Sequence, residues 1–506
     1  SSQLARPQNN YRVNQILRWS WKKQYENEFE KAQKKAFRAQ SMVFEKTKRE
    51  RNSESIISKV NGITDKEGIY MKQKTNYIKV ASHEAKKGEV KKVLLLYSGG
   101  LDTSVMLKWI QDSYNADVVT LTMDLGQQND DLVAIQKKAL KFGAKKAIVL
   151  DVKDEFAQKY ISLGIKANAC YQGEYHLSTP IGRAITAAKA VEVAKQVGAD
   201  AIAHGCTGKG NDQVRLEGYM LALNPDIKII APVREWDMDR NEEIKYAMKY
   251  KIPIPASLDF PYSVDDNMWG MTWEGGEIED PQFIPKVEKF LTTYTLAKNA
   301  PDTEEFINIS FKKGIPVALN GKKMKLSLLI MLLNKIAGKH GVGVVHLVED
   351  RLIGLKDRGV YELPAGHVII SAHKALEQYV STRELNELKN QMDIKWAYLC
   401  YGAKWFDPVM SAINSFNDQV NQKVEGIVTV KLYKGTATVV AMTSPFAMHH
   451  ASFTTSGGYK YNVNASAGFI EVYTLQMKLA NQRVQSTAKN ATGRVGTGGG
   501  GDVYVT

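Results

Sequence analysis

Cysteine is scarce in this chain of 506 residues, which has only Cys170, Cys206 and Cys400. No two of them are spaced as Cys-x-x-Cys, which argues against a disulfide framework or a structural zinc site and is typical of a reducing compartment. Long apolar runs are also missing, since none approaches the roughly 18 to 20 residues that a membrane span requires. We therefore expect a cytoplasmic protein without membrane contact, with a mitochondrial or other organelle matrix as the alternative. The length predicts two or three domains.

Positive charge is concentrated at one end. The net charge is +14, and residues 1–90 hold 20 Lys or Arg against 10 Asp or Glu, so this leader carries +10 of the total. No Gly or Pro occurs from Arg12 to Asn61, and apolar residues recur there at spacings of three and four, as in an amphipathic helix. The apolar stripe consists of Trp21, Tyr25, Phe29, Ala32, Ala36, Ala39 and Val43.

We expect residues 1–90 to be a basic helical extension that docks on a neighbouring subunit or partner, with residues 51–90 as a linker. No apolar stretch near the start resembles a secretory signal. A solvated charged helix, a polyanion contact and the remnant of a targeting segment stay open as alternatives.

A glycine-rich stretch, Tyr97–Ser104, follows the apolar run Lys91–Leu96 and precedes a helical pattern at Val105–Ser113. Two adjacent glycines permit a sharp turn that exposes backbone N–H groups, and Ser98, Thr103 and Ser104 add hydroxyl donors near a helix N-terminus. This combination predicts a phosphate-binding loop, although a plain turn is the alternative. It matches neither the Walker pattern nor the dinucleotide fingerprint.

Strand and helix signals alternate from residue 91 to 255, which predicts a doubly wound parallel-sheet nucleotide-binding domain of the α/β class. Residues 256–468 mix short strands and helices, including a helix at Leu326–Gly338 and a strand at Val424–Leu432, and are expected to form a second, α+β synthetase and multimerisation domain. Residues 469–506 are expected to hold a C-terminal helix, Phe469–Asn490, and a glycine-rich tail, Gly493–Gly501.

A second glycine-rich loop, Gly205–Asp212, follows the strand expected at Ala201–Ala203. The loop contains several hydrogen-bond donors and one carboxylate, and Arg215 follows one helical turn later. Such a mixture suits a zwitterionic substrate, whose carboxylate needs donors and whose ammonium needs an acceptor.

Three long motifs, Tyr97–Ser104, His204–Arg215 and Val348–Glu362, together with Tyr262–Asn267, resemble the argininosuccinate synthase family of ATP pyrophosphatase (PP-loop) enzymes. The resemblance covers about residues 91 to 480, in the family's order and spacing. It implies a ligase of arginine biosynthesis and the urea cycle that joins citrulline and aspartate through citrullyl-AMP. It further implies ATP with Mg²⁺, the release of AMP and pyrophosphate, and a homotetramer.

The resemblance also implies residue roles. ATP would contact Leu96, Tyr97, Ser98, Gly99, Gly100, Leu101, Asp102, Thr103, Ser104, Met123 and Gly205. Citrulline would contact Tyr175, Asn211, Arg215, Ser263, Thr272, Glu349 and Tyr361. Aspartate would contact Thr207, Asn211 and Asp212. Asp102 is the candidate catalytic residue, organising the loop or the metal, with capping of the following helix as the alternative. No motif indicates direct metal ligands.

Three positions depart from the expected pattern: Pro180 near the citrulline segment, Asp350 after Glu349, and Thr272 in place of a frequent serine. Proline lacks an N–H and a hydroxyl, so one substrate hydrogen bond is expected to be either absent or supplied by Thr179. His176 and His204 are expected to be structural.

Two other functions remain possible. A PP-loop enzyme acting on tRNA would use the basic leader but generally needs reactive cysteines. A structural or assembly subunit could retain the fold without the activity, yet it would have no physical reason to keep Asp102, Asn211, Asp212 and Arg215 together.

Overall fold

The computed structural model describes residues 77–128, 131–236, 238, 240–253, 261–450, 452 and 462–492. All of them belong to one compact unit, Asn76–Thr506. The helix expected between Arg12 and Asn61 and the tail Gly493–Gly501 lie outside the described residues.

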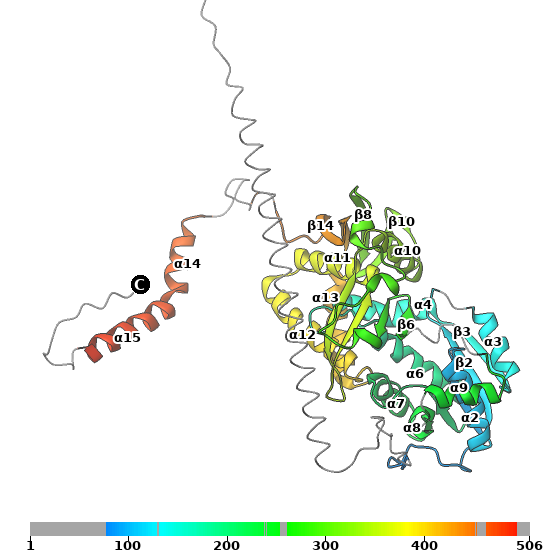
Figure 1. The fold of residues 1–506 in the computed structure, drawn as a ribbon. Helices are drawn as coiled ribbons and strands as arrows, with labels where there is room; N and C mark the ends of the chain where they lie inside the picture. The colour runs from blue at the N-terminus through cyan, green and yellow to red at the C-terminus, as the bar shows by residue number, and fades with distance from the viewer. Residues whose placement is uncertain are drawn as a thin grey trace, which may run out of the picture. The chain divides into compact units, whose positions relative to one another are not determined.

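The first half contains a five-stranded parallel sheet in the order β3-β2-β1-β4-β5 (Figure 1). Its strands are β1 (Lys92–Leu96), β2 (Asp117–Asp124), β3 (Lys146–Asp151), β4 (Ala201–Ala203) and β5 (Lys228–Ile230). The helices are α2 (Leu101–Tyr114), α3 (Leu132–Lys141), α4 (Lys153–Phe156), a π-helical turn η1 (Ala157–Ile161), α5 (Ser162–Lys166), α6 (Ser178–Val197), α7 (Asn211–Leu223), α8 (Pro232–Glu235) and α9 (Arg240–Lys249). This arrangement confirms the predicted α/β class.

Both faces of this sheet are covered at β1, which explains the uninterrupted apolar run of this strand. Val93 and Leu95 pack with Ile110 of α2, whereas Leu94 belongs to a different core cluster that includes Ile181 of α6. Strands covered on both faces need apolar side chains at successive positions. The chain proceeds from β1 to β2 on one side and places β4 on the other, so β1 lies at the switch point where ligands bind.

Residues 77–90 form a strap along β5, the edge strand of the sheet. Glu84 makes a parallel bridge with Ile229. The Ala85 N–H donates to the Ile229 carbonyl over 2.9 Å, and the Ile229 N–H donates to the His83 carbonyl over 2.8 Å. Ala85 and Val90 are buried. This part of the expected linker is therefore packed on the sheet.

Two antiparallel sheets form the second half. One has the order β11-β12-β7-β6 and consists of β6 (Ser263–Asn267), β7 (Gly270–Glu274), β11 (Val344–Asp350) and β12 (Lys356–Glu362). The other has the order β10-β9-β8-β13-β14 and consists of β8 (Glu305–Lys312), β9 (Ile315–Leu319), β10 (Lys322–Lys323), β13 (Gly426–Tyr433) and β14 (Thr436–Thr443).

Helices and short turns surround these two sheets. They are α10 (Leu326–Lys339), α11 (Pro364–Val380), α12 (Arg383–Tyr401), α13 (Pro408–Val420), η2 (Gly276–Ile278), η3 (Val287–Lys289), η4 (Ala297–Asn299) and η5 (Asn421–Lys423). The combination of antiparallel sheets and helices agrees with the α+β character expected for this half.

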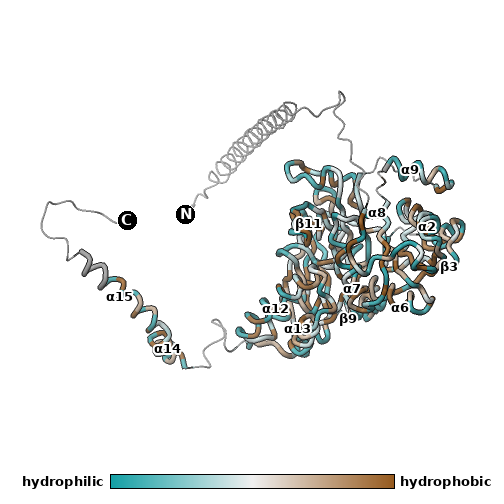
Figure 2. The backbone as a smooth tube through the Cα atoms, turned by 90° about the horizontal axis from the view of Figure 1, so that it is seen from below, coloured by the Kyte–Doolittle hydropathy of each residue, from teal (hydrophilic) through white to brown (hydrophobic). Residues whose placement is uncertain are grey.

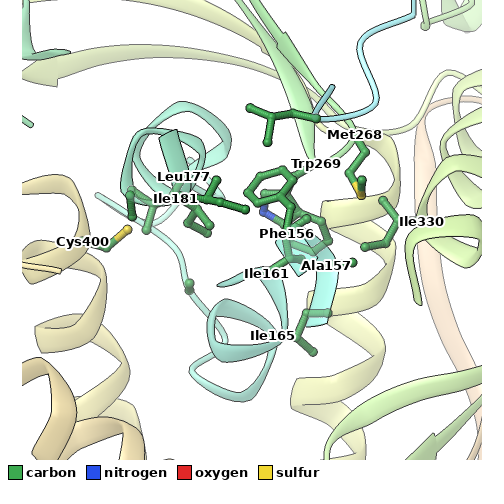
Figure 3. Packing of buried hydrophobic residues seen from close by; sticks show 14 of the residues in the cluster. Phe156, Ala157, Ile161, Ile165, Leu177, Ile181, Met268, Trp269, Ile330 and Cys400 are labelled. Carbon is green, nitrogen blue, oxygen red and sulfur yellow. The ribbon is translucent and has the colours of Figure 1, made fainter. Parts of the chain in front are cut away.

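Trp269, in the turn between β6 and β7, joins the two halves. Its indole N–H donates to the His176 carbonyl over 2.7 Å, and the ring is buried. Figure 3 shows Trp269 close to Phe156, with Met268 and Ile330 nearby. The packing fixes the β6–β7 sheet against the segment before α6.

Two helices, α14 (Ala465–Tyr473) and α15 (Leu475–Thr492), replace the single helix expected at Phe469–Asn490. Hydrophobic and hydrophilic residues are interspersed along the coloured parts of both helices (Figure 2), and Phe469, Val472 and Leu479 are exposed. Within the described residues, no helix is long and apolar enough to cross a membrane.

Candidate active site

A cavity of about 590 Å³ opens at the carboxyl ends of β1, β2 and β4 and is closed on its far side by β6, β7, β11 and β12. It brings together most residues to which the resemblance gave a role. Those lining it are Leu96, Tyr97, Ser98, Gly100, Leu101, Asp102, Thr103, Met123, Tyr175, Gly205, Thr207, Asn211, Asp212, Arg215, Ser263, Thr272, Glu349 and Tyr361.

Two of the expected nucleotide residues lie behind this lining. The buried Ser104 hydroxyl donates to the Gly100 carbonyl over 2.6 Å and contacts the Tyr97 hydroxyl at 2.9 Å. Gly99 has φ of +80°, and a Cβ there would lie 2.6 Å from Ile135. Both residues therefore shape the glycine-rich loop from within.

The glycine-rich loop has the geometry of an anion site. Helix α2 starts after Gly100, its N-cap residue, and the Lys138 ammonium holds the Gly99 carbonyl at 2.7 Å. The N-terminal N–H groups of a helix have no intrahelical acceptors, and the helix dipole favours negative charge there. Because Gly100 is the N-cap, Asp102 does not occupy the usual capping position; it lies in the first turn and lines the cavity.

Opposite this loop, two buried polar atoms have no hydrogen-bond partner among the described residues: Arg215 Nη2 and Tyr361 Oη. The other donors of Arg215 are engaged, since Nη1 donates to Asp212 over 2.8 Å and Nε to the Tyr401 carbonyl over 3.1 Å. Leaving such groups buried and unpaired costs about 1 to 3 kcal/mol each, more for a charged group. A polar ligand in the cavity would satisfy both.

Glu349 supplies the carboxylate of this region. It is buried on β11 and accepts a hydrogen bond from the Tyr401 hydroxyl. Burial raises the pKa of Glu349, while the Tyr401 hydrogen bond and the charges of Arg215 and Arg351 oppose that rise. The site therefore combines a free guanidinium nitrogen with a carboxylate, as a zwitterion requires.

Arg183, on α6, forms a charged bridge that the sequence did not single out. Its Nε donates to Asp212 over 2.8 Å, and its Nη2 contacts Asp265 of β6. Burial disfavours the Asp212 carboxylate, but pairing with Arg183 and Arg215 lowers its pKa below the usual value. Burial, together with the Asp212 charge, raises the pKa of Asp265. Asp212 thus stays ionised at the cavity wall.

A second unpredicted group lies on the far side of the cavity. Arg351 Nη2 contacts Glu274 and Asp357, each at 2.8 Å. Burial raises the pKa of Glu274 to about 7 despite the charge of Arg351. In the sequence, only the recurrence of charged residues beside Glu349 and Thr272 could have indicated this group.

The cavity wall near Pro180 and Thr272 is polar, although both residues depart from the expected pattern. Pro180 lies in the first turn of α6, where a proline removes no intrahelical hydrogen bond. The Thr179 and Thr272 hydroxyls contact each other at 2.9 Å, and both residues line the cavity. The Thr179 N–H donates to the Tyr175 hydroxyl over 3.0 Å.

His176 and His204, the two histidines near the site, each form a hydrogen bond with a backbone group. His176 Nδ1 meets the Ala169 carbonyl at 3.0 Å, and burial lowers its pKa to about 4. His204 accepts the Cys206 N–H over 3.2 Å at Nδ1, and its Nε2 contacts Glu217 at 3.1 Å. These contacts hold the local backbone and the Glu217 side chain in place.

A glycine-rich loop at the switch point of a parallel sheet, facing a zwitterion pocket to which both domains contribute, defines an ATP-dependent enzyme of the PP-loop class that acts on an amino-acid substrate. Family models match both halves: the arginosuccinate synthase N-terminal HUP domain over residues 92–253, and the arginosuccinate synthase C-terminal domain over residues 262–480. The chain belongs to the argininosuccinate synthase family, which confirms the resemblance.

Named relatives agree with this placement. The argininosuccinate synthase of Brevibacillus brevis is 47% identical over 392 residues, which cover 77% of this chain and 93% of the relative. That of Pyrococcus furiosus is 46% identical over 390 residues, covering 77% and 94%. A solved U34-tRNA thiolase from Methanococcus maripaludis aligns with 34% of this chain and 59% of its own at 18% identity, but its TM-score of 0.23 is too low to support a comparison.

Proposed function

We propose that this chain is an active argininosuccinate synthase, which uses ATP to join citrulline and aspartate and releases AMP and pyrophosphate. The observation that carries this proposal is the pair of unpartnered buried atoms, Arg215 Nη2 and Tyr361 Oη, in residues that line the same cavity as the glycine-rich loop. Family membership over both domains supports it.

Citrulline lies in the pocket formed by Tyr175, Asn211, Arg215, Ser263, Thr272, Glu349 and Tyr361. Arg215 pairs with its carboxylate and Glu349 accepts from its ammonium, because a free guanidinium nitrogen and an ionised carboxylate are the partners that these groups require. The ureido group then extends toward the nucleotide.

In the first step, the ureido oxygen of citrulline attacks the α-phosphorus of ATP. A phosphorus–oxygen bond forms to citrulline, the bond to the β-phosphate breaks, and pyrophosphate leaves with the electron pair. Ser98, Gly100 and Thr103 receive the departing charge at the N-terminus of α2, with Gly99 and Ser104 shaping the loop behind them. Such catalysis depends on positioning and on preorganised donors.

Mg²⁺ neutralises phosphate charge when it is bound with ATP. Asp102 is the residue in the first turn of α2 that would meet it, since a hard cation prefers carboxylate and phosphate oxygens. Leu96, Leu101, Met123 and Gly205 line the part of the cavity that we assign to the nucleotide.

In the second step, the amine of aspartate attacks the activated ureido carbon. A carbon–nitrogen bond forms, AMP leaves with the electron pair of its carbon–oxygen bond, and the amine loses a proton to give argininosuccinate. Thr207, Asn211 and Asp212 hold aspartate, and the pairing of Asp212 with Arg183 and Arg215 keeps its carboxylate ionised for the substrate ammonium.

We assign a homotetramer to the functional state, the cytoplasm or an organelle matrix to its location, and docking on a neighbouring subunit to the leader of residues 1–90. The exposed apolar side chains of α14 and α15 support assembly, because exposed apolar surface favours association. Native mass measurement of the full chain tests the oligomer.

Chemistry on tRNA is the weaker alternative. Burial raises the pKa of Cys170 to about 11 and raises the pKa values of Cys206 and Cys400 as well, so none of the three thiols readily forms a thiolate. Binding of tRNA that weakens with salt would revive that function.

The decisive experiment incubates purified protein with ATP, Mg²⁺, citrulline and aspartate and measures argininosuccinate by mass spectrometry. Product should form only when all components are present, with AMP and pyrophosphate in equal amounts. Reactions lacking citrulline or aspartate are the controls. Absence of argininosuccinate from folded protein would refute the proposal.

A further inference from the structure

Tyr401 lies behind the amino-acid pocket and has no role in the assignments above. It is the last residue of α12 and is only 1% exposed. Its contacts reach α7 of the nucleotide-binding domain and β11 of the second domain. A residue in this position can align groups from both domains.

The Tyr401 hydroxyl is shared by two residues of the pocket. It accepts a hydrogen bond from the Asn211 side-chain amide over 2.8 Å and donates one to the Glu349 carboxylate. The Asn211 amide oxygen accepts from the Leu352 N–H over 2.8 Å, so the orientation of the amide is fixed at both ends. The hydroxyl thereby sets the separation between an amide on α7 and a carboxylate on β11.

The ring and backbone of Tyr401 hold the third group, Arg215. The guanidinium carbon lies 4.7 Å from the centre of the Tyr401 ring, and Arg215 Nε donates to the Tyr401 carbonyl over 3.1 Å. Because Asp212 takes Nη1, the nitrogen left without a partner is Nη2. The Tyr401 ring is itself fixed by stacking on Tyr171, with 3.7 Å between ring centres.

We propose that Tyr401 is a positioning residue that orients Asn211, Arg215 and Glu349 to receive citrulline. This inference rests on the assignment of citrulline to the pocket made above. Tyr401 acts through the three residues and does not itself line the cavity. Its hydroxyl serves the alignment, whereas its ring serves packing, so the two contributions can be separated by removing the oxygen alone.

The test compares Tyr401→Phe with Tyr398→Phe. Tyr398 lies one turn earlier on α12, is 51% exposed and also contacts Tyr171 with its ring, which makes it a matched control. Citrulline and ATP binding are measured by calorimetry, and their KM values by pyrophosphate release. Thermal unfolding of each variant shows whether the fold is retained.

We expect Tyr401→Phe to weaken citrulline binding by about tenfold or more, since a hydrogen bond to a buried charged group is lost. Its ATP KM should stay within about twofold of the wild type, because the nucleotide loop is not touched. Tyr398→Phe should leave both unchanged. Unchanged citrulline affinity in folded Tyr401→Phe, or an equal loss for citrulline and ATP, would overturn the inference.

Tyr401→Phe is also made in a Glu349→Gln background. There the Tyr401 hydroxyl no longer donates to a buried carboxylate, so its removal leaves no buried charge without a hydrogen-bond donor. If the hydroxyl acts through Glu349, adding Tyr401→Phe to this background should weaken citrulline binding by no more than about threefold, because the two effects are coupled. A full additional tenfold loss would show that the hydroxyl does not act through Glu349 and would overturn that part of the inference. Wild-type protein that binds no citrulline would refute the assignment of the pocket instead, so the two failures are distinct.

Discussion

The ring of Tyr175 stacks on the ring of Tyr361, with 4.1 Å between their centres and 29° between their planes. Tyr175 precedes α6 in the first half, and Tyr361 belongs to β12 in the second. The stack joins the two domains at the wall of the cavity, and the buried Tyr361 hydroxyl has no hydrogen-bond partner among the described residues. A bound substrate would supply the missing hydrogen bond.

Tyr361→Phe should therefore separate stability from substrate binding. Loss of an unpaired buried hydroxyl costs the free protein nothing, so the thermal midpoint should stay the same or rise. The citrulline KM should increase by about five- to tenfold, because the hydrogen bond to the substrate is lost. Steady-state kinetics and calorimetric melting measure the two effects. A lower thermal midpoint with unchanged citrulline KM would contradict this role.

Gly99→Ala should damage nucleotide binding. Gly99 has φ of +80°, and the added Cβ would lie 2.6 Å from Ile135, so the loop must shift. We expect the ATP KM to rise by about tenfold or more, measured by pyrophosphate release. Gly88→Ala is the control, since Gly88 has φ of +87° but open space around it. An equal rise of the ATP KM in both variants would show that the loop contact is not the cause.

Truncation should show how much the strap of residues 77–90 contributes to stability. Removing residues 1–76 leaves the strap and the cavity intact, so the kinetics should not change, whereas removing residues 1–90 also takes away the buried Ala85 and Val90 and the bridge to Ile229. We expect the longer deletion to lower the thermal midpoint by several degrees. Sedimentation of the shorter deletion also tests the proposed docking role, which predicts a smaller oligomer. Equal melting of both truncations would mean that the strap adds no stability.

A buried carboxylate away from the cavity should give part of the stability a pH dependence. Burial raises the pKa of Asp393 to about 7, although Lys389 beside it opposes the shift. The folded state then holds a proton that the unfolded state, with a pKa near 4, has lost, so stability from this group falls as the pH rises from about 4 through about 7.

Asp393→Asn should remove the contribution of this carboxyl group to the pH dependence of stability. The free energy of unfolding in urea should fall less between about pH 5 and about pH 8 than it does in the wild type. The exposed Asp117→Asn is a suitable control and should follow the wild type. A wild-type curve and an Asp393→Asn curve that run parallel would contradict the raised pKa.

Local patterns predicted much of the site because its loops are continuous in the chain. The glycines of Tyr97–Ser104 and the mixed polar loop at Gly205–Asp212 follow β1 and β4, and parallel strands bring their carboxyl ends to one edge. The helix boundary that was missed, between α14 and α15 at Thr474, has no Gly or Pro to indicate it.

The sequence by itself determined the α/β class, the position of the glycine-rich loop after β1 and the family, since turn chemistry, apolar runs and long motifs are local properties. Only the tertiary structure decided which charges meet. Arg183 pairs with Asp212 and Asp265, and the Tyr401 hydroxyl reaches Asn211 and Glu349, across separations that no local pattern encodes. Burial and pairing set the charge of these groups, and both arise only when the two domains close on the same cavity.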